Sequence, residues 1–144
     1  MARLKGKTAI ITGAGTGVGR SCMIRFAEEG ATVIGVSRTQ KNLDEAVAAA
    51  NKAAPNAASS IAADLSHDDA AETVARQVIK DHGRIDILVH AAGAGYSWNE
   101  KSPGSMNAVD ETTPDKWREV IGINLDAYYL MCRAVIPHMR NGGG

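Results

Sequence analysis

A glycine-rich segment, residues 12–19, lies between a short apolar run and a helical pattern, and it limits the possible folds more than any other feature. The preceding run, 8–12, is rich in β-branched residues, which is typical of a buried strand. Val18, Cys22 and Phe26 then recur every four residues, with Met23 and Ala27 beside them, as on one apolar face of a helix. The first amides of such a helix lack internal partners, and glycines let a ligand reach them. The segment therefore predicts an anion site of the kind that holds a pyrophosphate.

Two common phosphate-binding patterns do not fit the spacing of these glycines. G-x-G-x-x-G would need glycine at Val18 or at Arg20, and the phosphate-loop pattern would need a lysine that does not follow the glycines. The chain instead reads Thr-Gly-x-x-x-Gly-x-Gly from Thr12 to Gly19. This pattern resembles the cofactor loop of the short-chain dehydrogenase/reductase family. A glycine-rich turn without a ligand is the alternative interpretation.

The rest of the chain alternates between strand and helix patterns. Strand–helix–strand order favours parallel strands joined by right-handed crossovers. We therefore expect a doubly wound, Rossmann-type α/β fold with four parallel strands in the order 3-2-1-4. The domain would span 1–144 and would be incomplete at its C-terminus, because the resembled family continues with a further strand. The expected strands are 8–12, 31–37, 58–63 and 84–90, and the expected helices are 18–29, 42–54, 68–82 and one that starts at Pro114.

Composition excludes several classes of partner and site. The formal net charge is zero and the pI is about 6.9, which does not suggest nucleic acid or an anionic membrane as a partner. No stretch approaches the roughly 20 apolar residues of a membrane span, and no secretory signal is recognisable. Cys22 and Cys132 fall on expected helices, where small buried hydrophobes are the simplest interpretation, and no ligand spacing predicts a metal. We expect a cytoplasmic protein.

The residue after the second expected strand bears on the choice of cofactor. Dinucleotide folds that bind NAD carry an acidic residue about 20 positions past the glycines, where it binds the ribose 2′-hydroxyl. Here the strand ends at Ser37, and no carboxylate follows until Asp44. Arg38 instead offers a planar cation that suits a 2′-phosphate. The sequence therefore favours NADP over NAD, with a solvated surface arginine as the alternative.

The resemblance implies further cofactor-binding positions. Asp64 and Leu65 match an acidic residue and an apolar neighbour that lie by the adenine ring in the family; for Asp64, a loop or helix-capping role is the alternative. Where the family has Asn-Asn-Ala-Gly, this chain has 90–93, His-Ala-Ala-Gly, and we expect His90 to be structural rather than catalytic. The predicted cofactor-binding residues are Gly13, Gly15, Thr16, Gly17, Val18, Gly19, Ser37, Arg38, Asp64, Leu65, Ala91, Ala92 and Gly93.

The last third of the chain holds an irregular stretch and a long helix. In 94–112, Tyr96 and Trp98 either line a substrate pocket or cover the edge of the core. Thr113 is expected to cap the helix, and Pro137 to kink or fray it. Asn124 falls on the apolar stripe, so we expect a buried, hydrogen-bonded amide. The resemblance assigns Asn124 to the catalytic tetrad, where it holds a water in a proton relay; a structural amide is the alternative.

The family's other catalytic groups, a serine and a Tyr-x-x-x-Lys motif, lie downstream of this region, and none of the three tyrosines here precedes such a lysine. The resemblance implies an enzyme that moves a hydride between NADP(H) and a small carbonyl or alcohol substrate, with this chain as an inactive cofactor-binding half. The full-length protein would be a homo-oligomer paired through the helix that starts at Pro114. Alternatives are an epimerase or dehydratase, a non-catalytic nucleotide-binding module, and a structural domain without a ligand.

Overall fold

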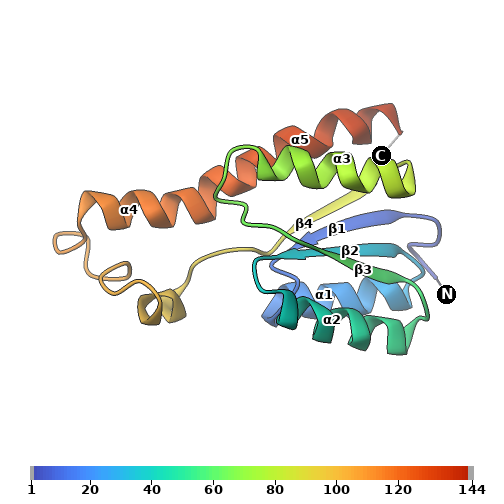
Figure 1. Ribbon diagram of the computed structural model, residues 1–144, viewed down its shortest axis with the longest axis horizontal. Coiled ribbons are helices and arrows are strands. Elements are labelled where there is room, and N and C mark those ends of the chain that lie inside the picture. The colour runs from blue at the N-terminus through green and yellow to red at the C-terminus, as the bar shows by residue number, and fades with distance from the viewer. Residues whose placement is uncertain (1, 143–144) are drawn as a thin grey trace.

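A sheet of four parallel strands forms the centre of the computed structural model, which describes residues 2–142 (Figure 1). The strands follow the predicted order, β3-β2-β1-β4. The two connections that follow β1 and β3 therefore leave in opposite directions along the sheet, and the order reverses at β1. Ligands of such sheets bind at this reversal, outside the carboxyl ends of the strands. The strands are β1 (Thr8–Thr12), β2 (Thr32–Ser37), β3 (Ala58–Ala62) and β4 (Ile87–His90).

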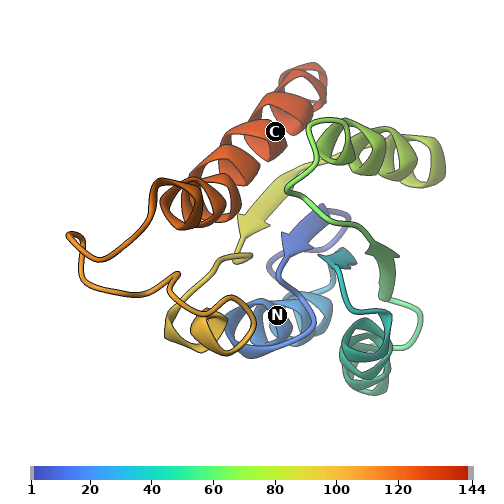
Figure 2. The ribbon, with the colours of Figure 1, turned by 60° about the vertical axis from the view of Figure 1, so that its left-hand side comes forward.

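Helices cover both faces of the sheet. In Figure 1, α1 and α2 lie below the strands and α3 and α5 lie above them, and Figure 2 shows the same three layers from another side. The helix α4 continues through a π-helical segment, η2, into α5, and a 3₁₀ helix, η1, interrupts the long loop after β4. The bounds are α1 (Gly17–Glu28), α2 (Gln40–Ala53), α3 (Ala70–His82), η1 (Tyr96–Glu100), α4 (Pro114–Ile121), η2 (Gly122–Asp126) and α5 (Ala127–Asn141).

The core has two parts, one on each face of the sheet. Neighbouring strand residues point to opposite faces. Ile10 accordingly packs in the cluster beneath α3 and α5, which includes Met131, whereas Ile11 packs in the cluster against α1 and α2, which includes Met23 and Leu43. All five side chains are fully buried. This two-sided burial explains why the strands read as apolar runs rather than as alternating patterns.

The buried face of α1 includes Met23 and Ala27 as the sequence predicts, but it differs at the start of the helix. Val18 is 72% exposed, and the face toward the sheet consists of Gly19, Met23 and Ala27. The cause is a close approach of two backbones: a β-carbon at Gly19 would lie 2.3 Å from the carbonyl oxygen of Gly13. Only glycine allows this contact, so the helix turns Gly19 inward and Val18 outward.

The single long helix predicted after Thr113 is also divided. Thr113 caps it as expected, accepting a hydrogen bond from the amide of Lys116, and Pro114 takes the first position. The π-helical segment η2 then separates α4 from α5. The expected fraying at Pro137 is wrong, because α5 continues through it to Asn141. The predicted domain runs to 144, and its last two residues, 143–144, lie outside the described residues.

Two further features concern the chain as a whole. Cys22 and Cys132 are free thiols and half-buried, less enclosed than the sequence predicts. Within residues 2–142, none of the helices combines the length and apolar character needed to cross a bilayer.

Candidate cofactor site

Three of the loop glycines are required by packing rather than by a ligand. A β-carbon at Gly13 would lie 2.6 Å from the carbonyl oxygen of Ala91, and one at Gly15 would lie 2.8 Å from the β-carbon of Asn42. A β-carbon at Gly19 would likewise lie too close to the backbone of Gly13, 2.3 Å from its carbonyl oxygen. The loop after β1 is therefore pressed against β4, α2 and its own helix, which fixes the position of the α1 N-terminus.

Gly17 is the exception in this loop. A β-carbon there would meet no atom within 4 Å, although its φ of +54° favours glycine. It is the first residue of α1, whose first turn holds no acidic side chain, and Thr16 provides no side-chain cap. The amides at this end and the positive pole of the helix dipole are thus left for an anion.

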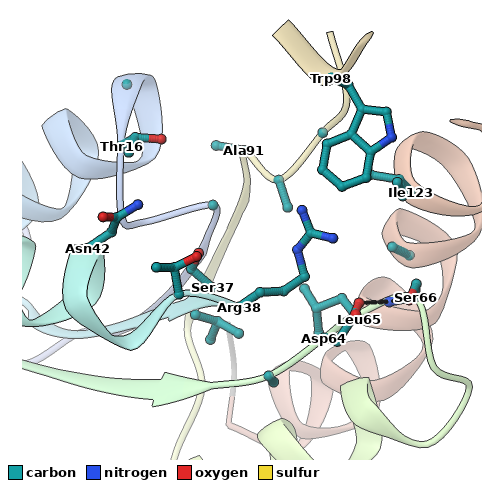
Figure 3. A pocket seen from close by; sticks show the side chains of 18 of the residues that line it. Thr16, Ser37, Arg38, Asn42, Asp64, Leu65, Ser66, Ala91, Trp98 and Ile123 are labelled. Atoms are coloured by element: carbon teal, nitrogen blue, oxygen red, sulfur yellow. Dashed lines mark hydrogen bonds between the residues drawn. The ribbon is translucent and has the colours of Figure 1, made fainter. Parts of the chain in front are cut away.

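A cavity of about 460 Å³ opens beside this helix end, above the carboxyl ends of the strands (Figure 3). It brings together most of the predicted cofactor-binding residues. Gly15, Gly19 and Asn124 are the predicted site residues that do not line it. The predicted residues in its wall are Gly13, Thr16, Gly17, Val18, Ser37, Arg38, Asp64, Leu65, Ala91, Ala92 and Gly93.

Several residues in the wall were not predicted. Asn42 reaches it from the first turn of α2, Ser66 from the turn after Asp64, and Lys101 and Ile123 from the chain after β4. None of them carries a sequence pattern that indicates a site, because their positions depend on how distant segments meet. Trp98 lines this cavity, a place that neither interpretation of its sequence position named.

Arg38 leaves the end of β2 and extends across the cavity. Its guanidinium carbon lies 4.5 Å from the centre of the Trp98 ring, within the range of a cation–π contact. Figure 3 shows the guanidinium between Trp98 and the segment that holds Asp64. Among residues 2–142, Arg38 makes no ion pair within 4.0 Å. Its charge is thus available to a ligand.

Asp64 has a local structural role as well as a place in the wall. Its Oδ1 accepts hydrogen bonds from the amide of Ser66, at 3.0 Å, and from the Ser66 hydroxyl, at 2.7 Å. Burial raises the pKa of Asp64, but these hydrogen bonds and the charges of Arg38 and His67 outweigh burial and lower the pKa below its usual value. Asp64 is therefore an anion at neutral pH and can accept further hydrogen bonds.

His90 joins the ends of β1 and β4. Its Nδ1 lies 3.1 Å from Oγ1 of Thr12, and the same oxygen accepts a hydrogen bond from the amide of Ala92. Because a hydroxyl can both donate and accept, the hydrogen bond between Thr12 and Nδ1 forms with either tautomer of the imidazole, and Nε2 is buried without a hydrogen-bond partner among the described residues. Burial lowers the pKa of His90, and the residue does not line the cavity. This geometry fits a structural histidine.

Asn124 lies in η2 and is exposed, not buried as the sequence predicts. It is fully hydrogen-bonded nonetheless: its Oδ1 accepts from the amide of Ala94 at 2.6 Å, and its Nδ2 donates to the carbonyl of Ala94 at 3.0 Å. A β-carbon at Gly93 would lie 3.1 Å from the same Oδ1. Asn124 therefore fixes the chain just after β4, next to the cavity rather than in its wall.

The cavity thus combines free helix amides, one unpaired guanidinium, a charged carboxylate and small residues at the end of β4. Residues 2–142 contain no group of three His, Cys, Asp or Glu side chains that could hold a metal ion. The helix amides and the guanidinium suit a ligand with two anionic groups. The carboxylate and the apolar part of the wall suit a flat ring that donates a hydrogen bond at its rim.

Proteins of known sequence resemble this chain along its length. It is 33% identical over 144 residues to a 3beta-hydroxysteroid dehydrogenase of Mediterraneibacter gnavus, with 100% of this chain and 49% of the relative covered. It is 34% identical over 146 residues to a glucose and ribitol dehydrogenase of Daucus carota, with 97% of this chain and 47% of the relative covered. The chain spans about half the length of these curated relatives.

Solved structures agree with the fold. A metagenomic short-chain oxidoreductase in complex with NADP matches with a TM-score of 0.86 at 33% identity, over 97% of this chain and 59% of the other. A short-chain dehydrogenase/reductase of Caenorhabditis elegans with cofactor matches with a TM-score of 0.84 at 29% identity, over 99% of this chain and 51% of the other. The sequence model of the short chain dehydrogenase family matches residues 7–144. The chain therefore belongs to the short-chain dehydrogenase family.

Proposed function

We propose that this chain forms the cofactor-binding half of an oxidoreductase that transfers a hydride between NADP(H) and a small carbonyl or alcohol substrate. The observation that carries the proposal is Arg38, whose unpaired guanidinium reaches into a cavity that also contains the free end of α1. A carboxylate in place of Arg38 would favour the ribose hydroxyl of NAD, whereas a guanidinium favours a phosphate. The short-chain oxidoreductase in complex with NADP is a relative of the same fold.

The residues of the cavity fit a dinucleotide part by part. The amides at the start of α1 would bind the diphosphate, and Ser37 with Arg38 would bind the 2′-phosphate. Asp64 and Leu65 would contact the adenine by a hydrogen bond and an apolar contact. The small residues 91–93 keep the end of β4 clear for the nicotinamide half. When bound, NADP supplies the hydride donor or acceptor.

Proton transfer needs groups that the sequence of 144 residues does not supply. The residues four positions after the three tyrosines are Glu100, Cys132 and Arg133, so the family's Tyr-x-x-x-Lys pair is absent from this stretch. Asn124 would support the relay by holding the chain after β4 in place. We expect the polypeptide by itself to bind NADP without turning over substrate. A second candidate function is a nucleotide-binding module.

Calorimetric titration with NADP⁺ and with NAD⁺ tests the cofactor. We expect the chain to bind NADP⁺ more tightly, and the substitution Arg38→Leu to weaken NADP⁺ by about tenfold or more while changing NAD⁺ little. Arg76→Leu is the matched control, since it removes the same charge from an exposed position on α3. Equal binding of both dinucleotides would contradict the choice of NADP, and binding of neither would contradict the proposed function.

Catalysis is tested separately. NADPH oxidation with a panel of ketones should show no turnover by the 144-residue chain, and turnover by a longer polypeptide that adds a Tyr-x-x-x-Lys motif. Robust turnover by the chain itself would mean that other groups transfer the proton. A longer polypeptide without that motif that binds NADP but never consumes it would favour the non-catalytic module.

A further inference from the structure

We propose that Trp98 and Lys101 form one anion subsite with Arg38, and that this subsite recognises the 2′-phosphate of NADP. The assignment rests on the function proposed above and adds two residues of the loop after β4 to it. It makes that loop, and not the end of β2 alone, a determinant of cofactor selectivity.

Two cations meet at one indole ring. The guanidinium carbon of Arg38 lies 4.5 Å from the centre of the Trp98 ring, and the Lys101 Nζ lies 5.6 Å from it. Neither cation has a carboxylate within 4.0 Å among the described residues, and all three side chains line the cavity. Both cations lie close to the same ring, so both would attract an anion that binds beside that ring.

The indole is a fixed platform rather than a loose surface side chain. Its Nε1–H donates to Oε1 of Glu119 at 2.7 Å, and the Ser102 hydroxyl donates to Oε2 of Glu119 at 2.8 Å. Lys116 contacts both Glu119 and Ser102. Glu119 belongs to α4, so this network ties η1 to the continuous helical rod that α4, η2 and α5 form. Tyr96, in the same 3₁₀ helix, is 89% exposed, which shows that the anchoring is specific to Trp98.

Acidic groups also lie near this subsite, and their places limit what it can bind. Asp64 and Glu100 line the same cavity. The Ser66 hydrogen bonds occupy one oxygen of Asp64, and Glu100 is exposed to solvent. The two acids would repel an anion, so the subsite favours a phosphate only where that phosphate contacts Arg38 and Lys101 directly.

Stacking defines how Arg38 would present itself to a phosphate. A guanidinium held beside an indole by a cation–π contact can still direct N–H groups to a phosphate, and its planar fork matches two phosphate oxygens at once. Lys101 adds a point charge from the other segment. Without Trp98, Arg38 would sample many rotamers in solvent, and more of its conformational freedom would be lost when the phosphate binds.

Affinities for NADP⁺ and NAD⁺ in matched variants test the subsite. Lys101→Met and Trp98→Leu should each weaken NADP⁺ by about fivefold while leaving NAD⁺ within about twofold. Lys80→Met, on α3, and Tyr96→Leu, on η1, are controls that should change neither affinity. The Lys101 effect should shrink as ionic strength rises, because the group is exposed.

Glu119 tests the platform. Glu119→Ala should reproduce the selective loss of NADP⁺ affinity, and Glu119→Gln should restore part of it, since an amide oxygen can still accept from the indole N–H. Circular dichroism establishes that each variant is folded. If Trp98→Leu does not fold, Lys101→Met still tests the subsite.

The outcomes separate the subsite from the proposed function. If the parent chain prefers NADP⁺ and Arg38→Leu removes that preference, but Lys101→Met and Trp98→Leu do not reduce it, the subsite is wrong and the proposed function stands. Equal losses for NADP⁺ and NAD⁺ in these two variants would also overturn the subsite, because the loop would then be a general wall. If the parent chain binds neither dinucleotide, or prefers NAD⁺, both proposals fail.

Discussion

At the scale of single residues, the loop after β1 contains two kinds of glycine. A β-carbon at Gly19 would overlap the backbone of Gly13, which cannot rotate away as a side chain could. At Gly17, a β-carbon meets nothing, and only the positive φ of +54° opposes it. The motif is thus mainly a packing requirement, and the packing leaves space beside Gly17 for the proposed ligand.

Alanine substitutions should separate these two kinds. We expect Gly19→Ala to lower the free energy of unfolding by about 3 kcal/mol or more, through overpacking of the loop. Gly17→Ala should cost only roughly 1–2 kcal/mol, the strain of a left-handed alanine. Urea denaturation of both variants measures the difference. Equal losses would mean that the loop can shift away from α1, contrary to the contacts described here.

His90 should make the stability of the fold depend on pH. Burial lowers its pKa below the usual 6.5, so between those two values the unfolded chain binds a proton that the folded chain does not. The contribution of the neutral imidazole is therefore present above pH 6.5 and is lost as the pH falls toward the lowered pKa. The free energy of unfolding should decrease from pH 7 to pH 5, and His90→Asn should reduce that decrease.

The matched control for this pH dependence is His67→Asn, which removes an exposed imidazole from the segment between β3 and α3. Denaturation curves at the two pH values give the comparison. A decrease that is the same with and without His90 would show that its imidazole is not enclosed as the contacts with Thr12 and the Tyr128 ring indicate.

At the scale of elements, the π-helical segment and the loop after β4 depend on each other. Asn124 makes two hydrogen bonds to Ala94, and Glu119 holds Trp98 and Ser102. The stretch 94–102 is thus attached to the helical rod at both of its ends. A π-bulge often marks a functional site, and here it turns Asn124 toward the chain that leaves β4.

Removing the Asn124 amide should free the start of this stretch. We expect Asn124→Ala to speed amide hydrogen exchange at Ala94 and through 94–102, with little change in the strands, because two hydrogen bonds disappear and no core contact does. Asn107→Ala, in an exposed part of the same loop, is the control. Unchanged exchange at Ala94 would show that other contacts hold the loop.

The sequence predicts where the helices and strands lie better than it predicts which side of a helix is buried or where a helix is interrupted. Apolar runs locate β1, β2 and β4, whereas β3 is only a weak strand pattern in the sequence. The strand order follows from the doubly wound fold and not from the runs themselves. The pattern does not predict that Val18 is exposed, because a close approach of two glycine backbones, at Gly13 and Gly19, turns Val18 outward. The pattern does not predict the π-helical segment either, because the hydrogen-bond partner of its Asn124 is Ala94, which lies 30 residues earlier.

The site shows the same division. Residues of the wall that follow a strand, such as Arg38 and Asp64, are predictable because parallel strands end at one edge of the sheet. Lys101 and Ile123 are not, because they reach the cavity from a loop and a helical rod whose paths the local sequence does not encode.

At the scale of the whole molecule, apolar surface remains uncovered where the rod leaves the sheet. The exposed large side chains of the rod are Trp117, Leu125, Tyr128, Tyr129 and Ile136. In addition, β4 pairs only with β1 among the described residues, so its other edge offers unpaired backbone groups. The formal net charge of zero provides no repulsion between copies at neutral pH.

We therefore expect two copies of this 144-residue chain to associate through the rod. Sedimentation velocity or light scattering should show a mass that rises with concentration, because burying this surface against a second copy removes apolar area from water. The double substitution Leu125→Lys and Tyr129→Lys, at positions that are each 56% exposed, should shift the protein toward a monomer. Tyr96→Lys is the control, because it places the same charge at a more exposed aromatic side chain away from the rod. A monomeric parent chain at high concentration would contradict the expectation. Association that persists in the double variant would instead place the contact at the open edge of β4.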